Sequence, residues 1–501
     1  MEKFLYERLK EKDPKLNVWF MYPAIENFAM ASLGYLSIFK MLDLDSELYV
    51  ERIYSDTKNY EIPLDCLDVA GFSMSFEIDI LTVIKMLKKY QIPLKSDERD
   101  EDTPLIFAGG PVLMANPKPF EEFFDFISIG EKCSLKLALD ELKKCTNLSR
   151  DDKLKKLSEI EGIYVPKYPK SEVKITRDNL NDEIAYTPIL SDNSYFKDSF
   201  IVELERGCPK MCKFCLASHL NIPTRFAPYE KIIKAIDFGL QYTDKLALLG
   251  AYVAGHPDFD KIINHISSYF EKRNIELSIS SLRADLTDEN LVKTLVKCNQ
   301  KTATIALEAG SQRLRDYINK NLSDEQILNT LKIAQTNGLK GMKIYTMIGL
   351  PTETEEDIVS LVELTKKMKK QIKDIGGAFD ITISTSTFIP KAHTPFETVK
   401  RTDKKILEKR INYLKKEFHK LGINFRPSSV DWDIIQSILS RYDKSLADLL
   451  IEVVERGGNL GAFKQTWKEF HKKGLLPSFI EASEIPFDNA KEPVWSFIKI
   501  N

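Results

Sequence analysis

The sequence lacks the features of a membrane or secreted protein. It has no run of about 18 apolar residues, the length that spans a bilayer, and its first residues, MEKFLYERLKEKDPK, are charged where a secretion signal would be apolar. An excess of charge of one sign is also missing, because 72 Lys and Arg residues face 74 Asp and Glu residues. This balance excludes a globally basic surface for nucleic acid. We expect a cytoplasmic, soluble protein with no membrane span.

Cysteine is scarce, and its distribution is uneven. The seven cysteines are odd in number, and Cys208, Cys212 and Cys215 fall within eight residues. Such crowding is typical of metal ligation and argues against a disulfide framework. The other four are spaced too irregularly to define a site, and we expect them to be buried small hydrophobic residues. They are Cys66, Cys133, Cys145 and Cys298.

The first part of the chain has the pattern of an α/β domain. Its 501 residues, 43% of them hydrophobic, predict about two to four domains with their own cores. Five short apolar runs alternate with helical segments before residue 131, which predicts a doubly wound, Rossmann-like parallel sheet over residues 1–145. Ligands of such sheets lie beyond the carboxyl ends of the strands, where this sequence has Ser73, Gly109 and Gly110. Residues 146–199 are predicted to be a linker.

Residues 200–396 alternate strand and helix patterns six times. The apolar runs are FIVELE, LALLG, LSISS, TIALE, MKIYTMIG and ITISTSTF. Crossovers of roughly 30 residues between them predict a partial (β/α)6 barrel with an open side. Residues 397–501 then turn to helical patterns that end in glycine, which predicts a helical C-terminal domain. The predicted fold class is therefore α/β, with a Rossmann-like domain, a partial barrel and a helical region.

The three crowded cysteines directly follow the first predicted barrel strand. They form the pattern C-x3-C-x2-C, from Cys208 to Cys215. Three thiolates of one loop hold three irons of a [4Fe-4S] cluster and leave the fourth iron open to a small ligand. The alternative is a structural zinc site completed by His219. The carboxyl end of a barrel strand is where active sites form, and this position favours the cluster.

The segment CPKMCKFC behind a barrel strand resembles the radical S-adenosylmethionine (radical SAM) superfamily. The resemblance implies that Cys208, Cys212 and Cys215 bind a [4Fe-4S] cluster, and that its open iron chelates SAM. One electron from the cluster would cleave SAM to methionine and a 5′-deoxyadenosyl radical. An electron donor such as flavodoxin or ferredoxin is then expected as a partner. By the same resemblance, Phe214 would lie near the adenine.

Three positions after the second and third barrel strands match SAM-binding positions of that superfamily. Gly250 stands in the segment that usually carries an acid for the SAM amino group. That acid is missing from Leu248–Ala251, so backbone carbonyls would have to serve. Ser281 and Arg283 follow the third strand and would bind the SAM carboxylate.

Further matches follow the fourth and fifth strands. Glu308 would bind the ribose hydroxyls, and Arg313 would pair with the carboxylate. The backbone of Ile348 and Gly349 would read the adenine. Each residue alone could equally be a turn residue or part of a buried ion pair, but their places at successive strand ends reinforce one another.

Longer segments narrow the resemblance to uncharacterised radical SAM proteins with an N-terminal cobalamin-binding-like domain. Among these segments are DVAGFSMSFE, FEEFFDFISIGE, ALEAGSQRLRDYINK and SRYDKSLADLLIEVVERGGNLGAFKQTW. Ser73, Gly109 and Gly110 resemble parts of the cobalamin motif, but the loop over residues 26–34 lacks its histidine. No histidine precedes His219. Bound cobalamin would thus be base-off, with water, no ligand or a weak donor such as Met30 below the cobalt. The alternative is a degenerate domain that serves as a scaffold or substrate cover.

The sequence leaves three classes of function open. The first is a radical SAM enzyme for cobalamin-dependent methylation, or a related modification, of an unactivated carbon. The second is a cobalamin-free enzyme resembling the methylthiotransferases that modify RNA or protein, although Cys66, Cys133 and Cys145 do not fall at strand ends as their second cluster requires. The third is a non-catalytic iron-sulfur or zinc protein.

A basic segment bears on the substrate. Residues 400–426 hold ten Lys and Arg residues and three acids, a balance of +7. Most runs of this kind are solvated helix faces, but beside an open barrel such a patch would guide an RNA or another phosphate-bearing substrate. RNA is therefore one of the expected options for the substrate.

Overall fold

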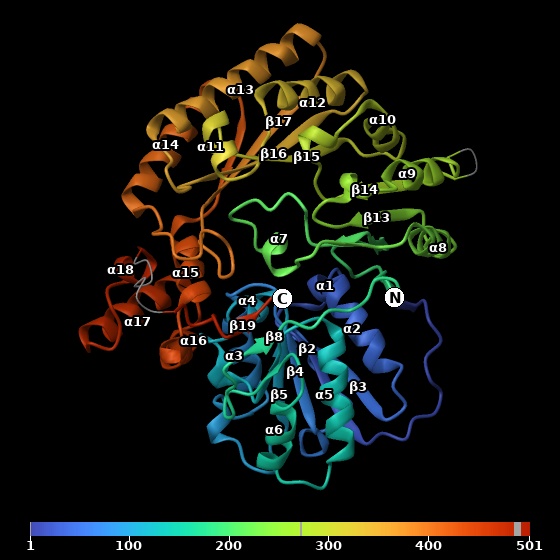
Figure 1. Cartoon of the computed structure of the whole chain (residues 1–501), viewed down its shortest axis with the longest axis vertical. Helices are drawn as coiled ribbons and strands as arrows, with labels where there is room; N and C mark the ends of the chain where they lie inside the picture. Colours follow the sequence, from blue (N-terminus) through green and yellow to red (C-terminus); the bar gives the residue numbers. More distant parts are fainter. Residues whose placement is uncertain (1, 271–272, 485–491, 501) are drawn as a thin grey trace.

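The N-terminal domain is built on a parallel sheet, as predicted. The computed structural model describes residues 2–270, 273–484 and 492–500, and Figure 1 shows this domain below the barrel. Its six strands have the order β3-β2-β4-β5-β6-β7, and only β7 is antiparallel to its neighbour. In chain order they are β2 (Leu16–Tyr22), β3 (Leu48–Tyr54), β4 (Val69–Ser73), β5 (Leu105–Gly109), β6 (Phe126–Ser128) and β7 (Ile163–Tyr164).

Strand β2 shows why both faces of this sheet are covered. Val18 and Phe20 pack in one core with α2 (Leu33–Asp43) and α5 (Lys132–Lys144), whereas Trp19 and Met21 pack in another with α3 (Asp79–Lys89). All four are at most 1% exposed. Side chains of a strand alternate between its faces, so a continuous apolar run requires helices on both sides. Shorter helices complete the domain, namely α1 (Glu26–Ala29), α4 (Pro111–Ala115) and α6 (Arg150–Ser158).

The segment expected to be a linker ties the two ends of the described chain to the fold. It contains α6 and the strand β7, which extends the N-terminal sheet. Further along, β8 (Val173–Lys174) pairs with β19 (Ile498–Lys499), and β9 (Ile189–Ser191) pairs with β1 (Glu2–Phe4). Residues 146–199 therefore form structure with three parts of the molecule.

The barrel is open and consists of two parallel sheets. The first has the order β10-β13-β14 and the second the order β15-β16-β17-β18, and a bridge between Leu282 and Ile305 connects them. All six predicted strands are present. They are β10 (Phe200–Glu203), β13 (Lys245–Leu249), β14 (Glu276–Ile279), β15 (Thr302–Glu308), β16 (Gly341–Ile348) and β17 (Asp380–Thr387).

A seventh strand corrects the predicted barrel boundary. Strand β18 (Asn424–Pro427) pairs in parallel with β17, although its sequence lies in the region expected to be helical. Helix α14 (Lys404–Lys420) ends just before Gly422, which has a φ of +64° and lets the chain turn back to the sheet edge. Four residues with a proline are too short a signal for an edge strand.

Helices cover the outer face of the barrel and leave the inner face open (Figure 1). On β16, Met342 and Ile344 are buried in the main core, whereas the alternating Lys343 and Tyr345 lie on the inner face, with Tyr345 38% exposed. The outer helices are α8 (Tyr229–Gly239), α9 (Phe259–Ser267), α10 (Glu289–Lys297), α12 (Asp324–Thr336) and α13 (Glu355–Ile375).

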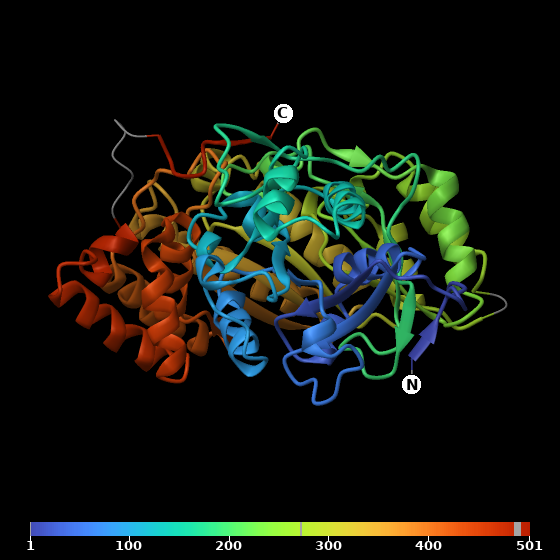
Figure 2. The ribbon, with the colours of Figure 1, turned by 90° about the horizontal axis from the view of Figure 1, so that it is seen from below.

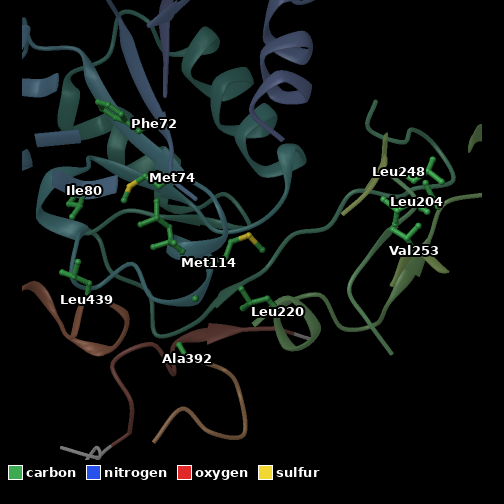
Figure 3. Close-up of a cluster of buried hydrophobic side chains, with 14 of the residues drawn as sticks. Phe72, Met74, Ile80, Met114, Leu204, Leu220, Leu248, Val253, Ala392 and Leu439 are labelled. Carbon is green, nitrogen blue, oxygen red and sulfur yellow. The ribbon is translucent and has the colours of Figure 1, made fainter. Parts of the chain in front are cut away.

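The C-terminal helices lie against the side of the N-terminal domain (Figure 2). They are α15 (Val430–Arg441), α16 (Ala447–Glu455), α17 (Leu460–Lys472) and α18 (Phe479–Glu484). Buried apolar side chains join the parts of the molecule, among them Met74, Met114, Leu220, Ala392 and Leu439 (Figure 3). Among the described residues, no helix is long and apolar enough to cross a membrane.

Candidate functional site

The cysteine loop lies between two short elements at the mouth of the barrel. The strand β11 (Glu205–Arg206) follows β10, and α7 (Leu216–Leu220) follows Cys215. Cys208 and Cys212 are buried, whereas Cys215 is partly exposed. Gly207, with a φ of +94°, leaves no room for a side chain, because a Cβ would lie 2.5 Å from the carbonyl oxygen of Asn221. The loop is therefore tightly folded, and the Cys215 thiol lies close enough to Cys208 and Cys212 to act electrostatically on both.

Residues after α11 (Gln312–Tyr317) hold this loop in place. The Asn319 side chain donates hydrogen bonds to the carbonyl oxygens of Lys210 at 2.9 Å and Met211 at 3.0 Å. The backbone N–H of Lys213 donates to the carbonyl of Ile318 at 3.0 Å. Asn319 has a φ of +60°, a conformation that asparagine tolerates better than most residues. Sequence analysis missed Asn319, and the asparagines at positions 319 and 321 were the available signal for this turn.

The three thiols fit a cluster better than a single zinc ion. Burial raises the pKa of the Cys208 thiol, and it raises that of Cys212 to about 11 against the opposing charges of Lys320 and Arg283. Thiolates at such a place need bound metal to compensate their charge. In the described parts of the chain, no three His, Cys, Asp or Glu side chains are grouped closely enough to hold one metal ion. A cluster binds each thiolate to a different iron and so accepts a wider spacing.

His219, the expected fourth ligand of the zinc alternative, serves the loop in another way. Its Nε2 atom is in a hydrogen bond with the carbonyl oxygen of Cys212, at 3.2 Å. The histidine is buried, and this bond fixes α7 to the preceding loop. The structure thus assigns His219 to holding the loop together and gives no support to a zinc site.

Charged residues from the ends of β14 and β15 and from the turn after α11 lie near Cys212. Arg283 follows β14 and pairs with Asp285 at 2.8 Å, while its Nη2 donates to the Lys320 carbonyl at 3.1 Å. Lys320 in turn pairs with Glu308 at 3.0 Å. Two residues predicted to bind SAM, Arg283 and Glu308, therefore lie near each other. Lys320 contacts both of them, and the sequence analysis did not single it out. Ser281, also at the end of β14, is exposed.

Glu308 is held in a strained conformation. It has a φ of +67° and sits where the register between β15 and β16 shifts, so a bulge turns its side chain out of the strand pattern. Its carboxylate is 12% exposed, and its partner Lys320 is 8% exposed. Backbone strain of this kind is retained where the surrounding structure enforces it, often at functional sites.

The predicted adenine region forms a small apolar cluster. Phe214 packs here with Met347 of β16 and Leu350, which follows that strand. Gly349 has a φ of +80°, its N–H donates to Glu353 at 2.6 Å, and its carbonyl accepts from Thr402 at 3.1 Å. Burial raises the pKa of Glu353 to about 7.

Ile348 and Arg313, which were predicted to contact the adenine and the carboxylate of SAM, are already bonded to other residues of the protein. The Ile348 carbonyl accepts from the N–H of Phe388 at 2.8 Å. Arg313 binds Asp357 and the carbonyl of Thr352, at 2.9 Å from the latter, and its side chain is 51% exposed. Arg313 is thus turned toward the start of α13. A role for these residues in binding SAM stays a prediction.

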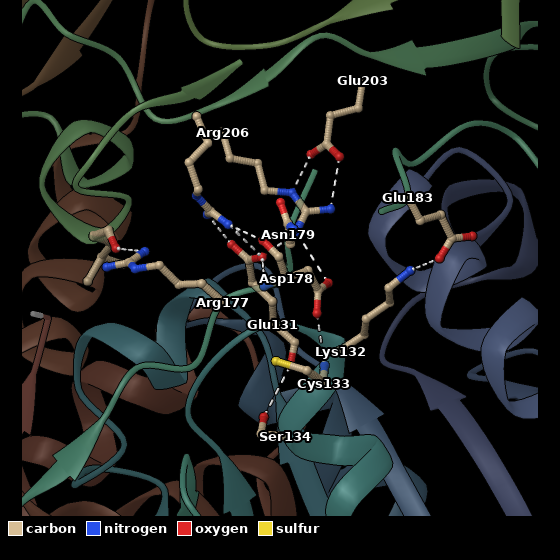
Figure 4. Close-up of polar contacts among 12 residues, drawn as sticks. Glu131, Lys132, Cys133, Ser134, Arg177, Asp178, Asn179, Glu183, Glu203 and Arg206 are labelled. Carbon is tan, nitrogen blue, oxygen red and sulfur yellow. Dashed lines mark hydrogen bonds and ion pairs between the residues drawn. The ribbon is translucent and has the colours of Figure 1, made fainter. Parts of the chain in front are cut away.

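An ion-pair network joins the cysteine loop to the N-terminal domain (Figure 4). Arg206, two residues before Cys208, makes a double hydrogen bond to Glu203 with both distances 2.9 Å. Arg206 also pairs with Glu131, which follows β6 of the N-terminal sheet, and with Asp178 at 3.3 Å. Arg225 of β12 (Arg225–Phe226) binds the same Glu131. The position of the cysteine loop is therefore coupled to a strand end of the other domain.

A cleft of about 360 Å³ lies between this strand end and the barrel mouth. On the N-terminal side it is lined by Gly34, Pro111, Met114 and Glu131, and on the barrel side by Glu203, Glu205, Gly207, Leu249 and Ala251. Gly34 has open space around its Cα, since no atom lies within 4 Å of a Cβ placed there. The cleft is the place where the two carboxyl edges face each other.

The predicted cobalamin residues lie at a closed part of the N-terminal edge. Ser73 and Gly109 end β4 and β5, and the Met74 N–H donates to the Gly109 carbonyl at 2.9 Å. A Cβ on Gly110, which has a φ of +125°, would lie 2.0 Å from the Met74 carbonyl oxygen. These loops therefore pack on each other, and Met74 is fully buried.

Segments from the end of the barrel and from the C-terminal region cover this edge. Lys391 and Ser440 bind Glu77, which is 4% exposed. His393 is in a hydrogen bond with the Ala115 carbonyl at 3.0 Å, and Asn116 donates to the Ser440 carbonyl at 3.2 Å. The loops after β4 and β5 thus meet protein where the sequence predicted a ligand.

The expectation that Met30 offers a weak axial donor is wrong for this structure. Met30 is 3% exposed, and its sulfur accepts hydrogen bonds from Arg52 at 3.2 Å and Tyr54 at 3.7 Å. These bonds place the thioether in the core beneath α2. The remaining cobalamin options, water or no lower ligand, stay predictions.

Half of the ten basic residues in this segment pair with acids. Arg401 is buried and donates to Thr387 at 2.9 Å, and five further residues pair with carboxylates. These pairs are Lys400 with Glu484 (3.3 Å), Lys404 with Asp431 (2.8 Å), Lys409 with Glu355 (3.5 Å), Arg410 with Glu353 (2.6 Å) and Lys420 with Glu417 (2.6 Å). The segment is therefore a weaker attractor of phosphate than its composition indicates.

The remaining cysteines do not form a second site. Cys145 and Cys298 are buried, as expected, but Cys66 is exposed and Cys133 is partly exposed. The prediction of a buried role was thus wrong for Cys66, which lies in a short 3-10 helix at the opposite edge of the sheet. Cys133 lies near the start of α5 and Cys145 just after its end.

Comparisons with known proteins agree with this architecture. The model for the N-terminal region of radical SAM proteins matches residues 34–166, and the model for the radical SAM superfamily matches residues 202–365. An uncharacterized protein, MJ0966 of Methanocaldococcus jannaschii, is 33% identical over 417 residues, which are 82% of this chain and 84% of that protein. The chain therefore belongs to the radical SAM superfamily, and its barrel follows an N-terminal region that matches the one of radical SAM proteins.

More distant similarities concern fold and barrel only. The cobalamin-dependent SAM radical enzyme OxsB, solved with aqua-cobalamin and SAM bound, has a TM-score of 0.50 at 13% identity, covering 92% of this chain and 71% of OxsB. The threonylcarbamoyladenosine tRNA methylthiotransferase MtaB of Aquifex aeolicus is 24% identical over 33% of this chain and 42% of its own length. The protein is a radical SAM enzyme, and its family implies a [4Fe-4S] cluster and SAM.

Proposed function

We propose that this enzyme binds a [4Fe-4S] cluster through Cys208, Cys212 and Cys215 and cleaves SAM reductively to a 5′-deoxyadenosyl radical. We propose further that the radical serves a cobalamin-dependent methylation, or a related modification, of an unactivated carbon. The observation that carries the first part is the cysteine loop, which the segment Ile318–Lys320 clamps at the barrel mouth with Arg283 and Glu308 beside it.

The residues of this chain would act on SAM by binding and orientation. Arg283 carries the positive charge that a carboxylate needs, and it lies beside Cys208 and Cys212, whose charges it feels. Glu308 would accept hydrogen bonds from the ribose hydroxyls once it shares its charge between Lys320 and the ligand. The cluster supplies one electron to SAM when it is bound and reduced. Flavodoxin or ferredoxin is the proposed source of that electron.

The open inner face of the barrel is the proposed place for the substrate. Its exposed side chains include Tyr345 and the neighbouring Lys343, whose Nζ lies 2.9 Å from the tyrosine hydroxyl. A radical formed at the cysteine loop would meet a substrate held along this face. The structure offers less for RNA, because most of the basic segment over residues 400–426 is paired or buried.

Support for cobalamin rests on the fold and the cleft. The cleft lies between the carboxyl edge of the N-terminal sheet and the cysteine loop, where a cofactor would reach both. Its volume of about 360 Å³ is at the lower end for a drug-sized ligand, and cobalamin is much larger. Binding would therefore require the two domains to separate at Glu131 and Arg206. Cobalamin would supply a methyl group when bound.

The methylthiotransferase alternative has less support. The matching relatives cover about a third of this chain, and the C-terminal region here is helical. Within the described residues, Cys66, Cys133 and Cys145 lie apart and form no metal-binding group. These three cysteines therefore offer no site for the second cluster that methylthiotransferases carry.

Two measurements test the proposal. Anaerobically reconstituted protein, reduced with dithionite in the presence of SAM, is expected to release 5′-deoxyadenosine, measured by chromatography. Its absence from protein with full iron content would contradict the first part. Titration with hydroxocobalamin, followed by electron paramagnetic resonance of the Co(II) state, tests the second. We expect binding and a base-off signal without nitrogen splitting, and absence of binding at tens of micromolar would favour the cobalamin-free class.

A further inference from the structure

The inward side chains of the second barrel sheet lie in ordered rows. On β16 the buried Met342 and Ile344 alternate with Lys343 and Tyr345, which turn to the inner face. The strand register continues each position across the sheet. One row consists of Ala306, Tyr345, Ser384 and Arg426, and the row one step nearer the amino ends of Thr304, Lys343, Thr382 and Asn424. Apart from Ala306, every side chain in these two rows carries a polar group.

Two of these side chains are cations without a carboxylate partner. Within the described chain Lys343 forms no ion pair, and its Nζ atom donates to the Tyr345 hydroxyl at 2.9 Å and lies 4.7 Å from the centre of that ring. Arg426 is exposed, and its side chain has neither an ion pair nor a hydrogen bond with the residues that the structure describes. It is also not among the five residues of the basic segment that pair with acids. Both charges are thus free to act on a ligand.

No acid stands between these two cations on the inner face. The four strands are described throughout, and the acids at their inward positions are Asp380 and Glu308. Asp380 begins β17 at the amino end of the sheet, whereas Glu308 ends β15 and pairs there with Lys320 at 3.0 Å. The middle of the face therefore carries a positive charge with hydroxyl groups around it.

Lys343 and Arg426 approach the same part of the face from two sides. Strand β17 lies between β16 and β18, so the axes of those two strands are about 10 Å apart. The bond of Lys343 to the Tyr345 hydroxyl directs its Nζ toward the row that contains Arg426. Ser384 stands in that row on the strand between them. A small anion over Ser384 would meet an ammonium, a guanidinium and hydroxyl groups, which are donors that phosphates and carboxylates bind in proteins.

We propose that this face binds an anionic group of the substrate, a phosphate or a carboxylate, between Lys343 and Arg426. The inference rests on the proposed function, because it takes the inner face as the substrate site, and it adds the chemical class of the substrate. Two free cations on an otherwise uncharged stretch of the face favour a compact anion over a neutral or cationic molecule.

The place of this site relates the anion to the reacting carbon. Met347 is the next inward residue of β16 after Tyr345, and it packs in one cluster with Phe214 of the cysteine loop. Two residues of a strand span about 7 Å, so the anion would lie about one such step away from the loop. The radical would then meet a carbon that is several bonds away from the phosphate or carboxylate.

The test is the binding of small aromatic anions to anaerobically reconstituted, unreduced enzyme, measured by fluorine NMR. SAM is present so that the probes do not compete for Arg283. The probes are 4-fluorophenyl phosphate and 4-fluorobenzoate, and the uncharged control is 4-fluorobenzyl alcohol. We expect wild type to bind one or both anions about tenfold more tightly than the alcohol. The anion that binds better tells whether the substrate carries a phosphate or a carboxylate.

Neutral and charge-conserving variants locate the binding. Lys343→Gln and Arg426→Gln should each weaken anion binding about tenfold and leave the alcohol unchanged, whereas Lys343→Arg should retain most of the affinity. The matched control for the double Gln variant is Lys332→Gln combined with Lys415→Gln. These exposed lysines of α12 and α14 remove the same charge from the outer surface, so the anions should lose much less affinity.

Three results would overturn the assignment. They are anion affinity that is unchanged in both single Gln variants, an equal loss in the outer control, and wild-type protein that binds neither anion more tightly than the alcohol. Retained affinity in Lys343→Arg separates a loss of charge from a loss of structure. Failure of the proposed function is read separately, because it shows as missing 5′-deoxyadenosine after reduction, whereas the anion titration involves no turnover.

Discussion

At the carboxyl edge of the N-terminal sheet, the loops after β4 and β5 pack against the later part of the chain, whereas at the barrel edge charged groups face a cleft. Glu77 at the first edge is bound by Lys391 and Ser440. Glu205 at the second edge keeps one carboxylate oxygen without a partner in the described structure. Both are carboxyl edges of parallel sheets, beyond which ligands are expected. Strand ends therefore indicate where a ligand could bind. Whether the polar groups there already have protein partners indicates whether the edge is free to bind one.

The largest contrast between the edges is expected from cysteine replacement. Changing Cys208, Cys212 and Cys215 together to Ala should abolish absorbance around 400 nm and remove about four irons per chain. Cys298→Ala, which alters a buried thiol elsewhere in the barrel, should retain both. Absorbance and iron analysis on anaerobic protein give the answer, and iron retained by the triple variant would place the cluster elsewhere.

At the carboxyl edge of the N-terminal sheet, the next expected effect is a loss of stability. Lys391→Ala leaves Glu77 buried without its cation, and we expect the free energy of unfolding to fall by ~3–5 kcal/mol. The matched control is Lys370→Ala, since Lys370 pairs with Asp374 on the surface, with side chains 79% and 57% exposed, and should cost ~0.5 kcal/mol or less. Urea denaturation measures both. Equal small losses would mean that this contact does not hold the edge closed.

Glu308 should affect ligand affinity instead. Glu308→Gln is expected to weaken SAM binding by ~1–3 kcal/mol, the cost of disturbing a charge-assisted hydrogen bond. Ser73→Ala, at the corresponding place on the other edge, should leave SAM binding unchanged. Calorimetry on reconstituted protein compares the two, and unchanged affinity in Glu308→Gln would mean that another acid binds the ribose.

The smallest expected effect is a pH dependence of SAM affinity. The pKa of Glu205 is raised to about 7 in the protein, so the neutral acid predominates below that pH and the carboxylate above it. Affinity for a cationic ligand should therefore decrease as the pH falls through 7, by at most about tenfold per unit. Glu205→Gln should show no such slope. A wild-type affinity that is flat between pH 6 and 8 would mean that the charge of Glu205 does not act on the bound ligand.

The sequence was most informative where structure depends on local pattern. Every predicted strand of the N-terminal sheet and the barrel is present, because alternation and continuous apolar runs record which faces are buried. The cysteine loop was recognisable because its three cysteines lie within eight residues. Strand β18 was missed because its four residues, the last of them a proline, carry little pattern.

Contacts between distant segments could not be read in the same way. Glu77 and Lys391 are 314 residues apart, and neither stands in a motif that would pair them. Asn319 reaches the cysteine loop from more than 100 residues away. Glu205 next to Arg206 looked like part of an ordinary charged strand end, and only the fold shows that its neighbours are paired and it is not.

Arg177 links the C-terminal end of the described chain to the helix that follows the cysteine loop. Its guanidinium donates to the Leu220 carbonyl of α7 at 3.1 Å and to the Ile500 carbonyl next to β19 at 2.8 Å. A purification tag fused after residue 501, or removal of the last residues, would thus disturb a group that also touches the helix behind Cys215. Loss of iron in such a preparation is the result that would reveal this link between Ile500 and α7.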